Sequence, residues 1–245
     1  MLFDGGFMHN CPADSAFSEA QDIWRDKQCD ILLSLGTGII LNRSPSDLRR
    51  PLGAVQVVAG NMTDATKAWG KFLNDRPQSQ NLFRLDPIYR GAGFGLDDVK
   101  KLKVIQKQTE EWLLTKEKEI SHICDRLIAA LFFFRPSSET YDGLQVGEIL
   151  CRLPTEEGQK LAVGILRKTD PIFKVKCNGE TFKINAKDAF SNLRSTGELR
   201  LEVTCGPAVP TIGNIKIAVM MQSTVVKYRW LPISGSPYII REDVN

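Results

Sequence analysis

Long apolar runs are missing from this sequence. A membrane-spanning helix needs about 18 to 20 apolar residues, whereas the longest run, Leu127 to Phe134, is far shorter and predicts a buried strand or the end of a core helix. No signal peptide is visible, because the chain starts Met1-Leu2-Phe3-Asp4-Gly5 without a basic region or a hydrophobic stretch. We therefore expect a cytoplasmic protein whose membrane contacts, if it makes any, are peripheral.

The sequence also lacks a large excess of either sign of charge. The formal net charge is +3 over 245 residues, and both signs are mixed throughout. Such a balance gives no electrostatic case for nucleic acid as a partner. The basic cluster Lys100-Lys101-Lys103 is interpreted as a solvated helix face, with contact to anionic lipid headgroups as the alternative.

The spacing that a zinc site requires is absent. The six cysteines, which are Cys11, Cys29, Cys124, Cys151, Cys177 and Cys205, form no C-x-x-C pair and have no histidine at ligand spacing. The chain is too long to need disulfide staples. The favoured interpretation is therefore a set of reduced, mostly buried thiols.

Hydrophobic residues make up 42% of the chain, which is enough for a real core and argues against wholesale disorder. In the first 50 residues, the apolar spacing predicts a helix over Ala13 to Trp24. The run Cys29 to Leu35, which ends in Gly36-Thr37-Gly38, suits a strand buried on both faces of an α/β sheet. The next stretch is mostly helical, with helices expected over Val55 to Trp69 and, with many charges, over Leu96 to Leu127.

The pattern changes near residue 127, within about ten residues. Short runs rich in Val, Ile, Leu and Phe follow, separated by turn residues, and Asn178-Gly179 is a strong hairpin signal. The runs are Gly147–Leu153, Leu161–Leu166, Ile172–Cys177, Thr181–Asn185, Glu198–Thr204 and Asn214–Val219. We expect an incomplete α/β domain over residues 1–126 and an all-β antiparallel sandwich over residues 127–245.

A set of short motifs carries the functional signal. Asp4-Gly5-Gly6 alone is weak, because any surface turn contains such residues, but Asn10-Cys11-Pro12 follows it at the start of a helix, and Ser34-Leu35-Gly36-Thr37-Gly38 follows at the end of a strand. In this order the motifs resemble those of patatin-like phospholipases and lipid acyl hydrolases, although Cys11 replaces the commoner second Asn. Two further segments are similar to a sequence motif found late in such domains, namely Leu82-Phe83-Arg84-Leu85-Asp86 and Leu96-Asp97-Asp98. The resemblance covers roughly residues 1 to 120, the C-terminal part of the patatin domain.

The resemblance implies the chemistry of lipid ester hydrolysis. Patatins use a Ser–Asp dyad in which the aspartate of D-G-G is the proton acceptor for the serine. Asp4 is therefore the candidate catalytic residue, and Gly5 and Gly6 would allow the backbone to aim its carboxylate; the alternative is that Asp4 only stabilises a turn. The implied substrate is a lipid or phospholipid, and the dyad needs no metal or other cofactor. His9 and His122 are expected to have no catalytic role.

The other half of the dyad is missing from these residues. No G-x-S-x-G occurs in the sequence, and Gly235-Ser236-Pro237 is only a look-alike in the sandwich region. We expect the chain to be a C-terminal fragment of a longer hydrolase, and to be inactive alone because it offers no nucleophile. The alternative is a non-catalytic patatin remnant that acts as an interaction or scaffold protein.

The end of the chain has a resemblance of its own. The phrase Ile233-Ser234-Gly235-Ser236-Pro237-Tyr238 is similar to the last-strand signature of filamin-type immunoglobulin-like repeats. Gly and Pro here would bend the chain before an edge strand. The resemblance implies a role in packing, spacing or binding of a protein partner for the sandwich region.

Overall fold

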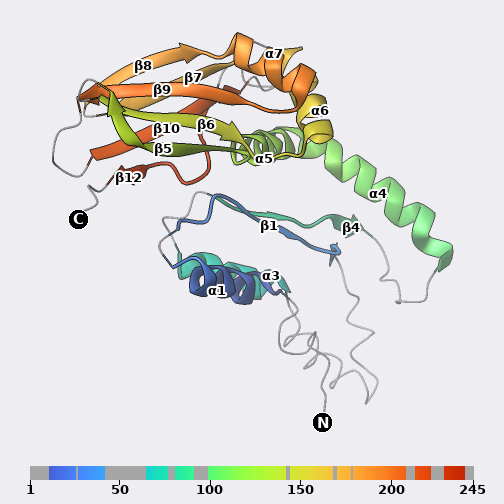
Figure 1. The fold of residues 1–245 in the computed structure, drawn as a ribbon. Coiled ribbons are helices and arrows are strands. Elements are labelled where there is room, and N and C mark those ends of the chain that lie inside the picture. The colour runs from blue at the N-terminus through green and yellow to red at the C-terminus, as the bar shows by residue number, and fades with distance from the viewer. Residues whose placement is uncertain are drawn as a thin grey trace. The chain divides into compact units, whose positions relative to one another are not determined.

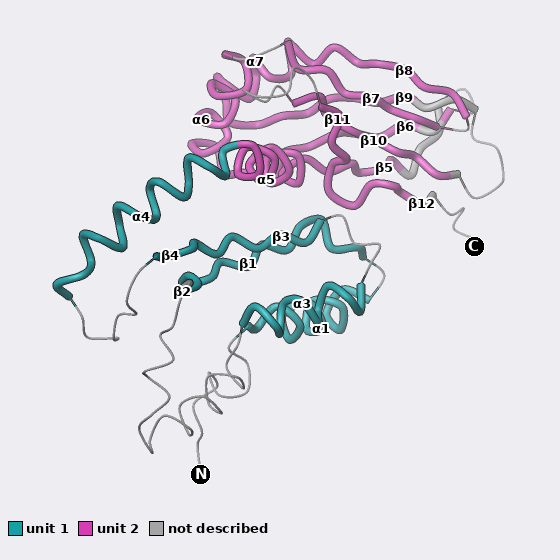
Figure 2. The backbone as a smooth tube through the Cα atoms, turned by 180° about the vertical axis from the view of Figure 1, so that it is seen from behind, with its two compact units in different colours: residues 1–117 teal, residues 118–245 magenta. Residues whose placement is uncertain are grey.

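The computed structural model describes residues 11–25, 27–41, 65–76, 81–90, 99–141, 144–167, 170–177, 179–207, 213–221 and 229–240. The chain divides into two compact units, residues 1–117 and 118–245 (Figure 2). Both units contain helices and strands. The mixed α/β character expected for the N-terminal part is confirmed, whereas the all-β character expected for the C-terminal part is not. Within the first unit, helices α1 (Ala13–Ile23) and α3 (Ala65–Asn74) lie side by side along one face of parallel strands (Figure 1).

The first unit builds a small core between its helices and strands. Its elements are α1 (Ala13–Ile23), β1 (Leu32–Leu35), β2 (Ile39–Leu41), α3 (Ala65–Asn74), β3 (Leu82–Leu85), β4 (Ile88–Arg90), a 3₁₀ turn (Val99–Lys101) and α4 (Leu102–Thr115). The expected helix after Pro12 is confirmed as α1, which contributes Phe17 to an edge-to-face contact with Phe72 of α3 at 5.8 Å between ring centroids. Strand β1 is shorter than the expected strand Cys29–Leu35, and Leu35 is 70% exposed rather than buried.

The parallel strands form an interrupted ladder. Leu32 to Leu35 pair with Leu82 to Leu85 at an offset of 82 − 32 = 50 residues. Beyond the interruption, Ile39 pairs with Ile88 at an offset of 88 − 39 = 49. Three residues, Gly36 to Gly38, therefore stand opposite two, Asp86 and Pro87. Such an extra residue is a bulge, which leaves a backbone N–H without its regular ladder partner.

The charged helix expected over Leu96–Leu127 is divided in two. Among the described residues it consists of α4 and α5 (Glu117–Ala129), with Lys116 between them. The hydroxyl of Thr115 donates to the carbonyl of Trp112 at 2.7 Å, and the Lys116 N–H donates to the carbonyl of Leu113 at 3.0 Å. These bonds to the third preceding residue replace the regular helical pattern and end α4. The two compact units divide close to this break.

The second unit contains two antiparallel sheets. The first has the order β5 (Phe132–Tyr141), β6 (Leu144–Cys151), β9 (Arg200–Pro207); the second has the order β11 (Arg229–Pro232), β10 (Gly213–Met221), β7 (Ile172–Cys177), β8 (Glu180–Asn185), with β12 (Tyr238–Ile240) also paired to β10. Strands β7 and β8 form the hairpin that Asn178-Gly179 predicts, and Gly179 has a φ of 85°. That positive φ is readily adopted by glycine.

The all-β composition expected for residues 127–245 is contradicted by helices α6 (Thr155–Leu166) and α7 (Lys187–Thr196), which lie between the strands in sequence. They pack side by side at one end of the sheets (Figure 1). The run Leu161–Leu166, expected to be a strand, is the second half of α6. The buried residues of α6, which are Gly158, Ala162 and Ile165, recur at helical spacing. Glu156 and Glu157 occupy the first turn of α6, where acidic side chains favour a helix. A sandwich of immunoglobulin type is not confirmed.

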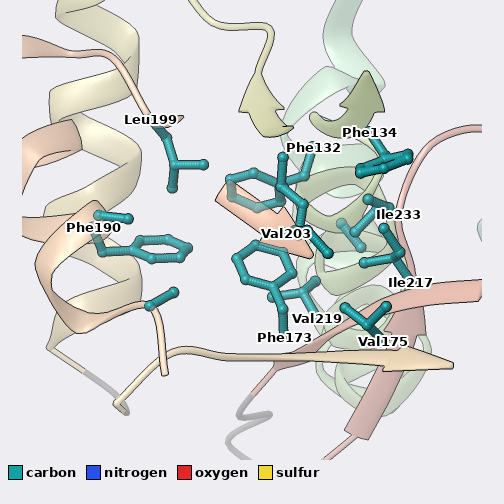
Figure 3. Close-up of a cluster of buried hydrophobic side chains, with 14 of the residues drawn as sticks. Phe132, Phe134, Phe173, Val175, Phe190, Leu199, Val203, Ile217, Val219 and Ile233 are labelled. Atoms are coloured by element: carbon teal, nitrogen blue, oxygen red, sulfur yellow. The ribbon is translucent and has the colours of Figure 1, made fainter. Parts of the chain in front are cut away.

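One aromatic cluster joins both sheets to α7. The Phe132 ring on β5 meets that of Phe173 on β7 edge-to-face at 5.6 Å and that of Phe190 on α7 at the same distance (Figure 3). All three side chains are completely buried. Aromatic rings contribute large buried areas, so this cluster fixes the two sheets against the helix.

The segment Ile233–Tyr238, whose sequence resembles a filamin signature, connects the two sheets. The Ser236 hydroxyl accepts the Ile217 N–H of β10 at 2.9 Å, and the Tyr238 hydroxyl accepts the Phe134 N–H of β5 at 2.9 Å. Tyr238 also donates to the carbonyl of Ser234. The segment therefore has a packing role inside this unit.

Candidate functional site

A buried ion pair occupies the bulge in the parallel ladder. One carboxylate oxygen of Asp86 accepts two bonds from the Arg84 guanidinium, at 2.7 Å from Nη2 and 3.1 Å from Nε. The other oxygen accepts the backbone N–H of Gly38 at 2.8 Å. The Arg84 and Asp86 side chains are only 9% and 11% exposed. The carboxylate thus supplies the partner that the bulge removes from the Gly38 N–H.

The bulge lies where parallel strands end at their carboxyl ends, which is where α/β folds usually place their sites. The Gly36 N–H still reaches the Leu85 carbonyl at 2.8 Å, and the ladder resumes with the Ile39 N–H on the Pro87 carbonyl at 2.7 Å. Pro87 itself has no N–H to offer. The Asp86 side chain and the Gly36–Gly38 turn are therefore one interlocked structure.

Both glycines of the S-L-G-T-G motif are required by close packing. A Cβ at Gly36 would overlap the Asp86 carboxylate, and a Cβ at Gly38 would overlap the Tyr89 ring. Gly38 also has a φ of 109°, which L-residues with a side chain rarely adopt. The motif is thus explained by two side chains that lie against it, Asp86 directly after β3 and Tyr89 in β4.

The same arginine brings three sequence motifs together. Its Nη1 donates to the Ser34 hydroxyl at 2.7 Å and to the Cys11 sulfur at 3.7 Å. Cys11 belongs to the Asn10-Cys11-Pro12 triplet, Ser34 opens S-L-G-T-G, and Arg84 lies in L-F-R-L-D. Residues that are 50 and 73 positions from Arg84 along the chain therefore meet at one guanidinium.

Helix α4 is held against β4 by polar side chains. The Tyr89 hydroxyl lies 3.0 Å from the Thr109 hydroxyl, which donates in turn to the Ile105 carbonyl. The Gln108 amide accepts the Arg90 N–H at 2.8 Å and donates to the Arg90 carbonyl at 3.2 Å. Gln108 therefore satisfies the edge of β4 as a neighbouring strand would.

The chemistry of this network is structural rather than catalytic. Both oxygens of Asp86 already accept hydrogen bonds, from the Arg84 guanidinium and from the Gly38 N–H, which hold the bulge. The Ser34 oxygen accepts a bond from a cation, which lowers its nucleophilicity, and Ser34 does not lie in a G-x-S-x-G elbow. We assign Arg84 and Asp86 as positioning residues.

None of the residues that the sequence singled out for catalysis is among the described residues. Asp4, Gly5, Gly6 and His9 lie outside the described residues. His122 lies in α5 of the second unit, where burial and then the positive charges of Arg229 and Arg126 lower its pKa. In the described ranges, no group of three or more His, Cys, Asp or Glu side chains could hold a metal ion.

The cysteines described with their side chains, Cys11, Cys29, Cys124, Cys151 and Cys177, are free thiols. Burial is the largest influence on Cys29 and Cys151 and raises the pKa of each. Raised pKa values leave less thiolate, so neither side chain is activated as a nucleophile. None of the helices in the described ranges is long and apolar enough to cross a membrane.

Substitution of Gly36 should test the packing of the bulge. We expect Gly36→Ala to lower the free energy of unfolding of the first unit by about 1 to 3 kcal/mol, because the new methyl group displaces the Asp86 carboxylate. Gly70→Ala in α3 is the matched control: a Cβ there has nothing within 4 Å, and the change should stabilise the helix by about 0.5 to 1 kcal/mol. Urea unfolding of both variants measures the difference, and equal stability for the two would contradict the proposed fit.

These features define an α/β unit whose loop at the carboxyl ends of parallel strands is held by a buried ion pair. No family model matches the sequence, and no solved structure matches it. The chain is similar to Phospholipase A I of Arabidopsis thaliana, with 29% identity over 130 residues. The match spans 51% of this chain and 10% of that protein, so the chain aligns with a small part of its relative. The similarity supports a phospholipase-related family.

Proposed function

We propose that this chain is the aspartate-bearing part of a patatin-like serine acyl hydrolase that cleaves lipid esters, with Asp4 as the proton acceptor. The observation that carries the proposal is the convergence of Cys11, Ser34 and Asp86 on Arg84, because these residues belong to the motifs that resemble patatins. The similarity to a protein named Phospholipase A I supports it independently.

The network suggests how the base would be positioned. Cys11 is seven residues after Asp4 and is nearly buried, at 9% exposure, against Trp69 and Phe72. Its contact with Arg84 anchors the downstream end of the segment that carries Asp4. A catalytic group must be held close to its productive geometry, and supporting contacts of this kind hold it there.

The proposed reaction needs a serine that these 245 residues do not supply in a G-x-S-x-G motif. Asp4 would take the proton from that serine while the serine oxygen attacks the ester carbonyl, and would return the proton to the leaving alcohol, which leaves an acyl-serine. A water molecule, deprotonated by Asp4, would then attack the acyl-serine, release the fatty acid and restore the serine. The expected substrate is therefore a lipid ester such as a phospholipid. The chain by itself should hydrolyse none.

The test is to express the complete reading frame that contains these residues beside the 245-residue chain and to assay both on fluorescent phospholipids. We expect release of fatty acid by the complete protein only, and only when it contains a G-x-S-x-G serine. Equal hydrolysis by the 245-residue chain would overturn the proposed need for that serine. An inactive complete protein that carries both motifs would overturn the assignment as a hydrolase.

A further inference from the structure

The outward face of the larger sheet in the second unit is unusually basic. Strand residues alternate between faces, and the inward residues of β7 and β10, such as Phe173 and Val219, are completely buried in the core. The outward positions of β7, β8 and β10 include four lysines, Lys174, Lys176, Lys183 and Lys216, of which all but the half-buried Lys174 are exposed. We call these four the lysine face.

The lysine face places like charges directly opposite one another. In the antiparallel registers, Lys174 pairs with Lys183 and Lys176 pairs with Lys216. Like charges at directly opposite positions destabilise a sheet. The other outward positions that share this face through the registers are Ile172, Thr181, Asn185, Asn214, Ala218, Met220, Trp230, Pro232 and Ile239, and none is acidic. The paired lysines therefore repel one another across the strands, which suggests that their shared positive charge serves binding.

The smaller sheet offers an internal comparison. Its outward positions carry both signs, with Arg135, Glu148, Arg200 and Glu202 on β5, β6 and β9. Arg135 and Glu148, which are directly opposite, form an ion pair at 2.6 Å. Glu148 is also directly opposite Glu202, so this face too contains a like-charge pair, but it carries both signs, whereas the lysine face carries only one.

An aromatic side chain accompanies the lysines. The ammonium groups of Lys174 and Lys183 lie 4.7 Å and 5.9 Å from the centroid of the Trp230 ring on β11. Met220 lies directly opposite Trp230 on β10. The face therefore combines several cations with a half-buried aromatic and a flexible apolar side chain.

We propose that the lysine face docks this protein on the surface of a bilayer that contains anionic phospholipid. Basic residues near such a surface each add about fivefold to its attraction, and Trp is favoured at the boundary between headgroups and acyl chains. A sheet face presents its lysines in one layer, as contact with a planar headgroup surface requires. The choice of a bilayer over single-stranded nucleic acid, which also binds lysines and aromatics, rests on the proposed lipid substrate.

Sedimentation of the full chain with vesicles tests the proposal without any hydrolysis, so its failure is distinguishable from failure of the proposed function. The vesicles contain phosphatidylcholine alone or with about 30% phosphatidylserine. The test variant carries K174Q, K176Q, K183Q and K216Q. The control, K160Q, R167Q, K187Q and R194Q, makes the same charge change on exposed positions of α6 and α7 and beside them.

We expect the wild type and the control to bind the anionic vesicles within about threefold of each other and the test variant to bind at least about a hundredfold more weakly. Binding should fall steeply as ionic strength rises from about 0.1 M to 1 M, because the Debye length falls from about 10 Å to about 3 Å. The melting temperature of the test variant should stay within about 3 °C of the wild type. If the fourfold variant does not fold, K174Q/K183Q and K176Q/K216Q are tested separately, each with an expected loss of about 25-fold.

Three results would overturn the proposal. They are the absence of wild-type binding to anionic vesicles, equal binding by the test and control variants, and preferential binding of a single-stranded oligonucleotide. The last outcome, with the same dependence on the four lysines, would assign the lysine face to nucleic acid instead.

Discussion

On the proposed function, replacement of Asp4 by Asn in the complete reading frame that contains these residues should lower kcat/KM for lipid esters by about two to four orders of magnitude. The substitution keeps the size of the side chain and removes the carboxylate that would take the serine proton. Loss of the negative charge beside the activated serine should move the effect toward the larger figure. Lipid binding should change little, because Asp4 is not expected to contact the acyl chain.

The measurement is steady-state hydrolysis of a fluorescent phospholipid together with vesicle binding by the same variant. His9→Ala is the control, since His9 is the other titratable group close to the D-G-G motif and a Ser–Asp dyad does not use it. Its kcat/KM should stay within about threefold of the wild type. If His9→Ala abolished turnover while Asp4→Asn left it near the wild-type value, the dyad would be replaced by a Ser–His mechanism.

The elements that the sequence predicted well are those that local patterns determine. Helix α1 follows from apolar spacing after Pro12, and the β7–β8 hairpin follows from alternating residues around Asn178-Gly179. Both signals lie within short local segments of the chain, so they need no knowledge of the rest of it. Reliance on a short local pattern also explains why the strand predicted at Leu161–Leu166 was wrong. Six apolar-rich residues are too few to distinguish a hydrophobic period of 2 residues from a period of 3.6 residues.

The candidate site was predictable in its parts and not in its assembly. The motifs containing Cys11, Ser34 and Asp86 were visible as a resemblance, but nothing in the sequence placed them on one guanidinium. The bulge depends on a change of register between β1–β3 and β2–β4, which only the paired strands define. One signal was available: Arg84 and Asp86 are opposite charges two positions apart at the end of an apolar strand, where a buried pair is the simplest way to accommodate both.

The lysine face shows the limit of reasoning from net charge. A value of +3 gives no case for an anionic partner, yet strand pairing gathers Lys174, Lys176, Lys183 and Lys216 on one surface. Each lysine was individually an ordinary polar residue of an alternating strand. Register, which sets cross-strand neighbours, is what turns them into a cluster.

Removal of the Arg84 cation should be the most damaging single change to the first unit. In Arg84→Met the Asp86 carboxylate, which is 11% exposed, keeps its charge and loses its counterion, and breaking a buried pair in this way typically costs about 3 to 5 kcal/mol. Unfolding in urea, monitored by hydrogen exchange at the amides of β1 and β3, reports the stability of the first unit separately. Lys107→Met, which removes a cation from a pair with Glu111 at 78% and 66% exposure, should cost less than about 0.5 kcal/mol.

A second substitution separates the charge from the packing. Arg84→Met/Asp86→Asn removes the unpaired negative charge and keeps an oxygen that can accept the Gly38 N–H. The double variant should therefore recover about 1 to 2 kcal/mol of the unfolding free energy that Arg84→Met loses. Recovery is expected because the cost in the single variant comes from an uncompensated carboxylate rather than from lost contacts of the arginine side chain. A double variant less stable than Arg84→Met, or an Arg84→Met variant no weaker than Lys107→Met, would show that the ion pair does not hold the bulge.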